Sequence, residues 1–350
     1  TIMNNNNNNS IKLAISHGEI NGVGYEVILK TFSDARMLEH CTPILYGSTK
    51  VASYHKKLLA PQHQEMTFSA LTDAKQAKDH RFNVVNIVPD EIKLDIGKST
   101  EVAGQLSRLA LERACEDLKN GNVDVLVTAP INKKNIQSND FDFPGHTEYL
   151  SSKFEGKSLM MMVCDRIRIG IMNNHLSISE VPAAICHDLL MEKIQIMNDS
   201  LKRDFGIRMP KIAVLALDPH AGDDGVIGTQ DRNVVKPAID EAASKGILCY
   251  GPFPSDGFFG SSEFNKFDGV LALYHDQGLI PFKLMSFTEG VNYTAGLPII
   301  RTSPAHGTGY DIAGKDKASE QSFRAAVYLA CNILRNRHEY DELTKNPLDK

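Results

Sequence analysis

The chain has 350 residues and a formal net charge of −5, and 42% of its residues are hydrophobic and 23% charged. This composition is typical of a globular protein, and the length suits one large or two medium domains. The negative charge argues against nucleic acid or an anionic membrane surface as a partner, and no apolar run approaches the roughly 18 residues of a membrane span.

The chain opens with the low-complexity stretch TIMNNNNNNS, residues 1–10. A run of asparagines cannot bury apolar surface, so we expect a disordered tail here. The stretch has neither the basic region nor the apolar region of a signal peptide. The six cysteines are scattered without a C-x-x-C pair, which favours reduced thiols in a cytoplasmic protein over a disulfide framework or a cysteine zinc site.

Short apolar runs alternate with helical patterns along the rest of the chain. The runs predict strands at residues 11–16, 42–47, 83–88, 123–129, 158–163, 166–172, 211–217 and 268–274. Two helical patterns, residues 101–121 and 232–246, end at a glycine, which is a common helix terminator. This alternation predicts an α/β fold with parallel strands and crossover helices.

One predicted strand differs from the others in its pattern. The stretch RIRIGIM, residues 166–172, alternates charged and apolar side chains, whereas strands buried on both faces are apolar throughout. We therefore expect an antiparallel edge strand or an arm there, and not a central strand.

Three of the predicted strands are followed by a histidine, namely His175, His220 and His275. Ligands of parallel sheets bind beyond the C-terminal ends of the strands. A histidine at a strand end is most often an ordinary polar loop residue. Three that converge would suit Zn²⁺ or a similar divalent ion, with coordination positions left for a substrate. Spacing alone leaves both interpretations open.

Other loops are candidates for anion binding. The stretch FPGHTEYL, residues 143–150, places Thr147 at a predicted helix start, where it either caps the helix or contacts an anion. The Gly-rich stretch GEINGVGYE, residues 18–26, matches neither common nucleotide-binding glycine motif, and we expect a tight turn there. Residues 290–319 are dense in Gly, Thr and polar groups, which indicates either a functional loop or a long structural one.

The sequence resembles the 4-hydroxythreonine-4-phosphate dehydrogenase family of vitamin B6 biosynthesis. The matching stretches occur in family order over about residues 11–330, and they are GEINGVGYE, VTAPINKK, FPGHTEYL, NNHLSISEVP, DPHAGDDGVIG, GPFPSDGFF, YHDQGLIPFK, GVNYTAGLPIIRTS and HGTGYDIAGK. Each is weak alone, but the combination is specific. The last stretch is also similar to the adenosine-binding loop of isocitrate and isopropylmalate dehydrogenases.

The resemblance implies an α/β fold of two domains, each a parallel or mixed sheet flanked by helices, as in isocitrate and isopropylmalate dehydrogenases, with a cleft between them. The first domain, on the nucleotide side, would comprise residues 11–130 and 297–350. The second, residues 131–296, would carry the metal, the substrate and the dimer interface. The family also implies a homodimer in which histidines of both subunits bind each metal.

The resemblance assigns roles to residues of this chain. It implies a divalent metal, with zinc expected and cobalt, manganese, nickel or magnesium as alternatives, bound by His175, His220 and His275. The substrate would be bound by His146, Thr147, Lys283, Asn292 and Arg301. The residues His306, Gly307 and Asp311 would contact NAD or NADP. Asp256, Asp276 or a bound water would accept the proton during catalysis.

The chain departs from the family pattern at several positions. In the first loop Glu19 replaces Asp, Ile20 replaces Pro and Tyr25 replaces a second Pro. Further along, Asp218 stands where Asn is usual, Pro304-Ala305 where Val-Asp is common, and Gly309 where Ala is common. The loss of a carboxylate at position 305 affects the affinity for the nucleotide and the choice between NAD and NADP more than the chemistry.

The implied reaction is the NAD-dependent oxidation of 4-phosphooxy-L-threonine to 2-amino-3-oxo-4-phosphooxybutanoate, which decarboxylates to 3-amino-1-hydroxyacetone 1-phosphate. One alternative is a paralogous dehydrogenase of a four-carbon sugar-acid phosphate such as threonate 4-phosphate. Another is a metal-dependent lyase or hydrolase that uses no nicotinamide, although the stretch HGTGYDIAGK argues against it.

Overall fold

The computed structural model describes residues 10–89, 91–138, 141–286 and 288–345. The chain forms two compact units, Thr1–Asp142 with His306–Cys331, and Phe143–Ala305 with Asn332–Lys350. The predicted disordered tail lies outside the described residues apart from Ser10. The predicted domains divide the chain at residues that differ from the boundaries of these units. A compact unit is not by itself an independent domain, so the predicted domain boundaries stay a prediction.

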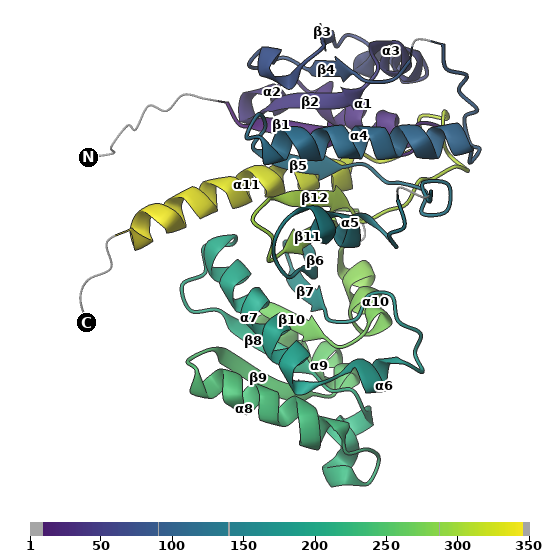
Figure 1. Cartoon of the computed structure of the whole chain (residues 1–350). Coiled ribbons are helices and arrows are strands. Elements are labelled where there is room, and N and C mark those ends of the chain that lie inside the picture. The colour runs from purple at the N-terminus through teal and green to yellow at the C-terminus, as the bar shows by residue number, and fades with distance from the viewer. Residues whose placement is uncertain (1–9, 90, 139–140, 287, 346–350) are drawn as a thin grey trace. The chain divides into compact units, whose positions relative to one another are not determined.

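The predicted α/β fold is confirmed, since each unit contains strands flanked by helices (Figure 1). In the described part of the first unit the strands are all parallel, in the order β3 (Ser69–Leu71), β4 (Asn83–Asn86), β2 (Thr42–Gly47), β1 (Lys12–Ser16) and β5 (Val125–Thr128). Nearly all residues of β1, β2 and β5 are buried, as expected of parallel strands covered on both faces.

The helical elements of the first unit connect these strands. They are α1 (Gly24–Phe32), α2 (Met37–His40), α3 (Thr49–Lys57), η1 (Pro61–His63), η2 (Ala74–Gln76) and α4 (Glu101–Lys119). The helix α4 confirms the helix predicted at residues 101–121. It begins where the Thr100 hydroxyl accepts a hydrogen bond from the backbone N–H of Ala103, with Glu101 in its first turn and Lys119 in its last, as the helix dipole favours.

The second unit contains a mixed sheet. Its described strands follow the order β12 (Arg301–Pro304), β11 (Val291–Ala295), β6 (Leu159–Cys164), β7 (Ile167–Ile171), β10 (Gly269–Ala272), β8 (Lys211–Leu215) and β9 (Leu248–Phe253). The pairs from β12 to β7 are antiparallel, whereas those from β7 to β9 are parallel.

The helical elements of the second unit lie mostly between the parallel strands. They are α5 (His146–Lys153), α6 (Val181–Ala184), α7 (His187–Arg203), η3 (Pro219–Gly225), η4 (Asp231–Val235), α8 (Lys236–Ser244), α9 (Ser255–Gly260), η5 (Glu263–Lys266) and α10 (His275–Ser286). The final helix, α11 (Gln321–Thr344), contributes residues to both units. The helix predicted at residues 232–246 is divided, because a π-helical turn precedes α8, which has a proline in its first turn.

The strand β7 corrects one expectation. Its pairing with β6 is antiparallel, as predicted, but it also pairs in parallel with β10 and so lies inside the sheet. The charged residue that suggested an edge, Arg168, donates to the backbone oxygen of Asp268 and stacks its guanidinium 4.8 Å from the ring centroid of Phe205. A guanidinium with these partners is tolerated in an interior strand.

Each predicted strand segment contains a strand of the structure, but four strands have no sequence prediction. These are β3, β9, β11 and β12. The sequences LCYGPF of β9 and RTSP of β12 contain proline, and VNYTA of β11 begins with a valine and an asparagine. Proline and polar residues weaken the apolar periodicity by which strands are predicted.

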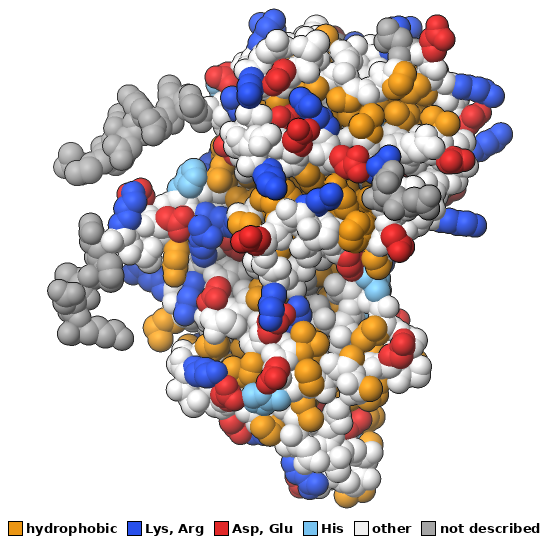
Figure 2. All heavy atoms as spheres, in the orientation of Figure 1, with side chains coloured by type: hydrophobic (Ala, Val, Ile, Leu, Met, Phe, Trp, Pro, Cys, Tyr) orange, Lys and Arg blue, Asp and Glu red, His pale blue; other side chains and the backbone are white. Residues whose placement is uncertain are grey.

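The surface drawn in Figure 2 carries acidic and basic side chains interspersed with apolar ones, and no single sign of charge dominates that face. Among the helices of the described residues, none is both long and apolar enough to cross a membrane.

A buried ionic network fastens the last helix to the second unit. The carboxylate of Asp204 accepts a hydrogen bond from Arg337 Nε at 2.7 Å and another from the Tyr293 hydroxyl at 2.5 Å. The guanidinium of Arg337 also donates to the backbone oxygen of Pro298 at 2.8 Å. The side chains of Arg337 and Asp204 are only 8% and 3% exposed, so neither charge can be solvated if its partner is removed.

We predict that Arg337→Met lowers the free energy of unfolding by about 3–5 kcal/mol, because it leaves the Asp204 carboxylate buried without its charged partner. Urea unfolding measures the change, and Arg335→Met, at an exposed position of the same helix, serves as the control. A loss of less than about 1 kcal/mol in Arg337→Met would show that the network contributes little to stability.

Two buried histidines stack on a tyrosine in the first unit. The rings of His17 and Tyr25 have centroids 5.4 Å apart, and those of Tyr25 and His55 are 5.1 Å apart. His17 Nδ1 lies 2.7 Å from the oxygen of Gly18, and His55 Nε2 lies 2.9 Å from the oxygen of Ile20. Burial lowers the pKa of both histidines from the usual 6.5 to about 4.

These lowered pKa values predict acid sensitivity. The unfolded chain binds protons at His17 and His55 near pH 6.5, whereas the folded chain does so only near pH 4. Folding is therefore fully stabilised above about pH 6.5, and the free energy of unfolding falls as the pH drops toward 4. We expect a loss of roughly 2 kcal/mol for each histidine between about pH 7 and pH 5.

Urea unfolding at the two pH values tests this expectation. His55→Gln, whose amide can still donate to the oxygen of Ile20, should reduce the loss on acidification, whereas His338→Gln at an exposed position of α11 should leave it unchanged. An equal loss in His55→Gln and in the wild type would assign the acid sensitivity to other groups.

Candidate functional site

The three histidines at predicted strand ends follow three adjacent parallel strands. The strand β10 pairs with β7 on one side and with β8 on the other, in parallel on both sides. His175 follows β7, His220 follows β8, and His275 is the first residue of α10, which begins shortly after β10. Since parallel strands end at one edge of a sheet, the three loops that carry these histidines leave the same edge.

Two of the histidines are oriented by carboxylates. His175 Nδ1 lies 2.9 Å from Glu148 Oε1, and His275 Nδ1 lies 2.7 Å from Asp276 Oδ1. The side chains of His175 and His275 are 39% and 49% exposed. A carboxylate at one ring nitrogen fixes the tautomer and orients the ring, which is a common arrangement around histidines that bind metals through the other nitrogen.

The third histidine lies in a left-handed turn. His220 and the next four residues all have positive φ, with values of 54°, 53°, 80°, 46° and 52°. Only Gly222 among them adopts this conformation without strain, and a Cβ there would lie 2.5 Å from the oxygen of Gly228. Backbone strain of this kind is found preferentially at functional sites.

A buried carboxylate holds the chain just before this turn. Asp231 accepts hydrogen bonds from the backbone N–H groups of Leu217 and Asp218, both at 2.8 Å. Burial raises the pKa of Asp231, and the two backbone donors oppose that shift. The Asp231 contacts fix the exit of β8 toward His220.

The described part of a single chain does not assemble a complete metal site. Among the described residues no group of three or more His, Cys, Asp or Glu side chains is placed to hold a metal ion. The structure thus brings the three histidine loops to one edge of the sheet but does not gather the three imidazoles around one point.

The packing of α10 against the sheet depends on Gly278, whose role could not be inferred from the sequence. A Cβ at Gly278 would lie 2.3 Å from Ile171 Cδ1 and 3.0 Å from the Cβ of Ala272. Only glycine lets α10 pack this closely on β7 and β10. Its close packing sets the position of His275 at the start of the helix.

Two buried amides at the strand ends were missed by the sequence analysis. Asn173 is 8% exposed and Gln277 is 7% exposed, and both bind backbone groups of neighbouring strand ends. Their stretches, NNHLSISEVP and YHDQGLIPFK, drew attention to the histidines, and nothing in the spacing marks the amides as buried.

The two candidate proton acceptors are both exposed. Asp256 lies in the first turn of α9, and Asp276 is 71% exposed in the first turn of α10. Asp276 is hydrogen-bonded to His275, whereas no contact of Asp256 distinguishes it. The geometry therefore ties Asp276 to a candidate ligand and leaves the choice between the two open.

The alternative in which Thr147 caps a helix is wrong. The N-cap of α5 is Gly145, and no side chain accepts a hydrogen bond there. His146 and Thr147 are the first two residues of the helix, and Thr147 is 9% exposed. The position of Thr147 near a helix N-terminus is compatible with contact to an anion.

Two further candidates share one face of the sheet. The register pairs Asn292 with Ser303 on β11 and β12, and Arg301 Nη1 lies 3.2 Å from the hydroxyl of Thr294. Arg301 is only 2% exposed, and Oδ1 of Asn292 is buried with no hydrogen-bond partner among the described residues. A buried guanidinium is suited to an anionic group, whereas the amide oxygen of Asn292 can only accept a hydrogen bond, for example from a hydroxyl group of a ligand.

The remaining substrate candidate, Lys283, is exposed on α10. It lies eight positions after His275 on the same helix. The structure gives its side chain no contact that decides what it binds.

The candidate nucleotide loop belongs to the first unit. His306 Nδ1 lies 3.0 Å from the oxygen of Gly307, its Nε2 is buried without a hydrogen-bond partner among the described residues, and burial lowers its pKa. A Cβ at Gly307 would meet no atom within 4 Å, so the backbone there is accessible. Asp311 is exposed.

The Gly-rich turn at residues 18–26 packs against this loop. Glu19, which replaces the usual Asp, accepts hydrogen bonds at Oε2 from the Tyr310 hydroxyl at 2.9 Å and from Asn135 Nδ2 at 2.7 Å. The backbone N–H of Val23 donates to the oxygen of Thr308 at 2.9 Å. The longer glutamate therefore supports the candidate nucleotide loop, a role that the sequence analysis did not predict.

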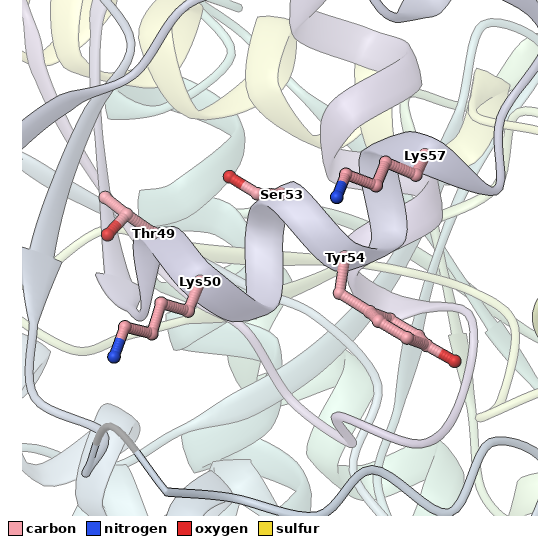
Figure 3. Close-up of a pocket in the computed structure, with 5 residues that line it drawn as sticks. All are labelled: Thr49, Lys50, Ser53, Tyr54 and Lys57. Atoms are coloured by element: carbon pink, nitrogen blue, oxygen red, sulfur yellow. The ribbon is translucent and has the colours of Figure 1, made fainter.

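A surface pocket of about 410 Å³ lies elsewhere in the first unit (Figure 3). Side chains of α3 line it, namely Thr49, Lys50, Ser53, Tyr54 and Lys57. It contains none of the residues that the sequence assigns to metal, substrate or nucleotide.

Comparisons with known proteins identify the family to which the chain belongs. The family model described as "Pyridoxal phosphate biosynthetic protein PdxA" matches residues 39–330. The chain is 52% identical over 344 residues to the 4-hydroxythreonine-4-phosphate dehydrogenase of Bacteroides thetaiotaomicron, and the match covers 98% of this chain and 94% of that protein.

Solved structures show the same relationship. The crystal structure of 4-hydroxythreonine-4-phosphate dehydrogenase from Klebsiella pneumoniae matches with a TM-score of 0.81 and 30% identity, covering 93% of this chain and 98% of that one. Isocitrate dehydrogenase from Methylococcus capsulatus matches with a TM-score of 0.50 and 9% identity over 95% of this chain and 88% of that one, which shows a shared fold alone. The chain therefore belongs to the PdxA family of pyridoxal phosphate biosynthetic proteins.

Proposed function

We propose that this chain is a metal-assisted dehydrogenase that oxidises the C3 hydroxyl of 4-phosphooxy-L-threonine with NAD or NADP. Relatives named 4-hydroxythreonine-4-phosphate dehydrogenase support the substrate. The observation that carries the proposal is the common sheet edge reached by the loops of His175, His220 and His275.

The donors at this edge fit a divalent metal. Imidazoles suit zinc first, and they also accept cobalt, nickel or manganese, with magnesium the weakest match. Glu148 and Asp276 engage Nδ1 of His175 and His275, which is the arrangement of histidines that ligate through Nε2. Neutral ligands would leave the charge of the ion uncancelled for catalysis.

We further propose that a second copy of the chain completes the site. No three candidate ligands gather within the described residues of one chain. The histidine loops and α10 also expose large apolar side chains, which is unfavourable in water unless another molecule covers them. These side chains are Leu176, Ile178, Val226, Ile227, Ile280 and Leu284, with exposures of 42%, 71%, 82%, 49%, 59% and 76%. A homodimer that covers these side chains would supply histidines from both subunits to each site.

In the proposed mechanism the chain binds and orients an anionic substrate. Arg301 and Lys283, with Asn292, His146 and Thr147, would hold the phosphate and carboxylate of the substrate, since charge-assisted hydrogen bonds give both affinity and orientation. The loop that contains His306, Gly307 and Asp311 would hold the nucleotide. When bound, the metal would polarise the C3 hydroxyl and the nicotinamide would accept the hydride from C3.

The chain must also move a proton. As the C3–H bond breaks, the hydroxyl proton would pass to Asp276, to Asp256 or to a water held by one of them. The product is a β-keto acid, so the C1–C2 bond can then break, with its electron pair moving toward the C3 carbonyl and carbon dioxide leaving. The enolate that remains then takes up a proton at C2 and gives 3-amino-1-hydroxyacetone 1-phosphate.

We place this activity in the cytoplasm. All six cysteines are free thiols, four of them buried, as is usual for proteins of reducing compartments.

We predict that the purified protein, supplied with zinc, forms NADH or NADPH when given 4-phosphooxy-L-threonine. Absorbance of the reduced nicotinamide measures the reaction, with threonate 4-phosphate as the competing substrate in parallel. Oxidation of threonate 4-phosphate alone would support the proposed dehydrogenase reaction but would show that the proposed substrate is wrong. No reduced nicotinamide with any substrate, in protein that has bound metal, would favour the lyase or hydrolase alternative.

We predict that His220→Ala loses bound metal and activity while it keeps its fold, because His220 is exposed and holds no buried group. Metal content after dialysis against zinc and the thermal midpoint are the measurements. His187→Ala is the matched control, since His187 is a partly exposed histidine of the same unit that pairs with Glu241 at 3.0 Å. Full metal content in His220→Ala would remove His220 from the site.

A further inference from the structure

Two buried amides bind both backbone polar groups of Leu273, the residue two positions before His275. The N–H of Leu273 donates to Gln277 Oε1 at 2.7 Å, and the oxygen of Leu273 accepts from Asn173 Nδ2 at 3.0 Å. Asn173 itself lies two positions before His175. This hydrogen bond therefore ties the loop of His175 to the loop of His275.

The amide of Gln277 extends the connection to the third histidine loop. Its Nε2 donates to the oxygen of Ala216 at 2.6 Å and to the hydroxyl of Ser255 at 2.9 Å. Ala216 follows β8 and lies four positions before His220. Gln277 thus bonds to the ends of β8 and β10 at once, and Asn173 bonds the end of β7 to that of β10.

These buried hydrogen bonds hold the histidine loops in place more strongly than hydrogen bonds at the surface would. Both amides are at most 8% exposed, so a lost partner would leave a buried donor or acceptor unsatisfied, which costs roughly 1–3 kcal/mol. Neither amide belongs to the candidate metal ligands or to the candidate substrate-binding residues. The backbone groups they bind lie at the ends of adjacent strands, and each lies just before a candidate histidine.

We propose that Asn173 and Gln277 are positioning residues that set the spacing of the three histidine loops and hence the affinity for the metal. The proposal rests on the proposed function, because it takes the histidines as ligands. Loss of partners that orient ligands lowers metal affinity by roughly 10- to 100-fold in known sites. We expect at least about a 10-fold loss when either amide is replaced.

The test compares Asn173→Ala and Gln277→Met with Asn198→Ala in the full-length protein. Asn198 is a matched control, since it is a buried amide of the same unit, 3% exposed, whose side chain binds Asp199 and no strand end. Cobalt(II) is the probe. Its dissociation constant is measured by competition with a chelator, its visible absorption reports ligand geometry, and the thermal midpoint of the metal-free protein reports the fold.

The proposal predicts weaker cobalt binding and an altered visible spectrum in Asn173→Ala and in Gln277→Met, and wild-type values in Asn198→Ala. Wild-type affinity and spectrum in both test variants would overturn the positioning role while leaving the proposed function intact. Equal weakening in Asn198→Ala would also overturn it, because the effect would then follow from general destabilisation. Failure of the wild type to bind cobalt would reject the proposed metal chemistry, and the inference with it.

Discussion

The parallel pairing of β7, β10 and β8 is the constraint on which the rest of the candidate site depends. Parallel strands must end at one edge, so residues nearly a hundred positions apart in sequence emerge together. His175, His220 and His275 are the polar residues that this chain places there. Hydrogen bonds from buried side chains, a left-handed turn and one closely packed glycine then determine how each loop leaves the sheet.

The sequence predicted the part of this arrangement that depends on apolar periodicity. Runs such as DGVLALY contain a strand of the structure, and their order along the chain indicated the α/β fold. The interior position of β7 was not predictable, because Arg168 is accommodated by Phe205 and a backbone oxygen that lie far away in sequence. The strands β9 and β12 were not predicted, because their prolines interrupt the apolar periodicity by which strands are predicted.

The candidate site shows the same division. Histidines at strand ends are visible in sequence, and so are the anion-binding candidates once the family resemblance is noticed. The contacts that orient them are not visible, since Asn173 and Gln277 look like ordinary polar loop residues until burial is known. The role of Glu19 is also not visible in the sequence. Its longer side chain is explained only by the structure, in which the carboxylate accepts hydrogen bonds from Tyr310 and Asn135. The residues that could carry the chemistry are therefore easier to predict from sequence than the contacts that position them.

We propose that three histidine loops at one sheet edge build a metal site shared between two copies of the chain. Anomalous X-ray diffraction at the zinc absorption edge, from crystals of the zinc-loaded protein, tests it most directly. We expect a peak within bonding distance of ring nitrogens of His175, His220 and His275, with the three histidines contributed by two subunits. A peak bound by other residues, or no peak at this edge of the sheet, would contradict it.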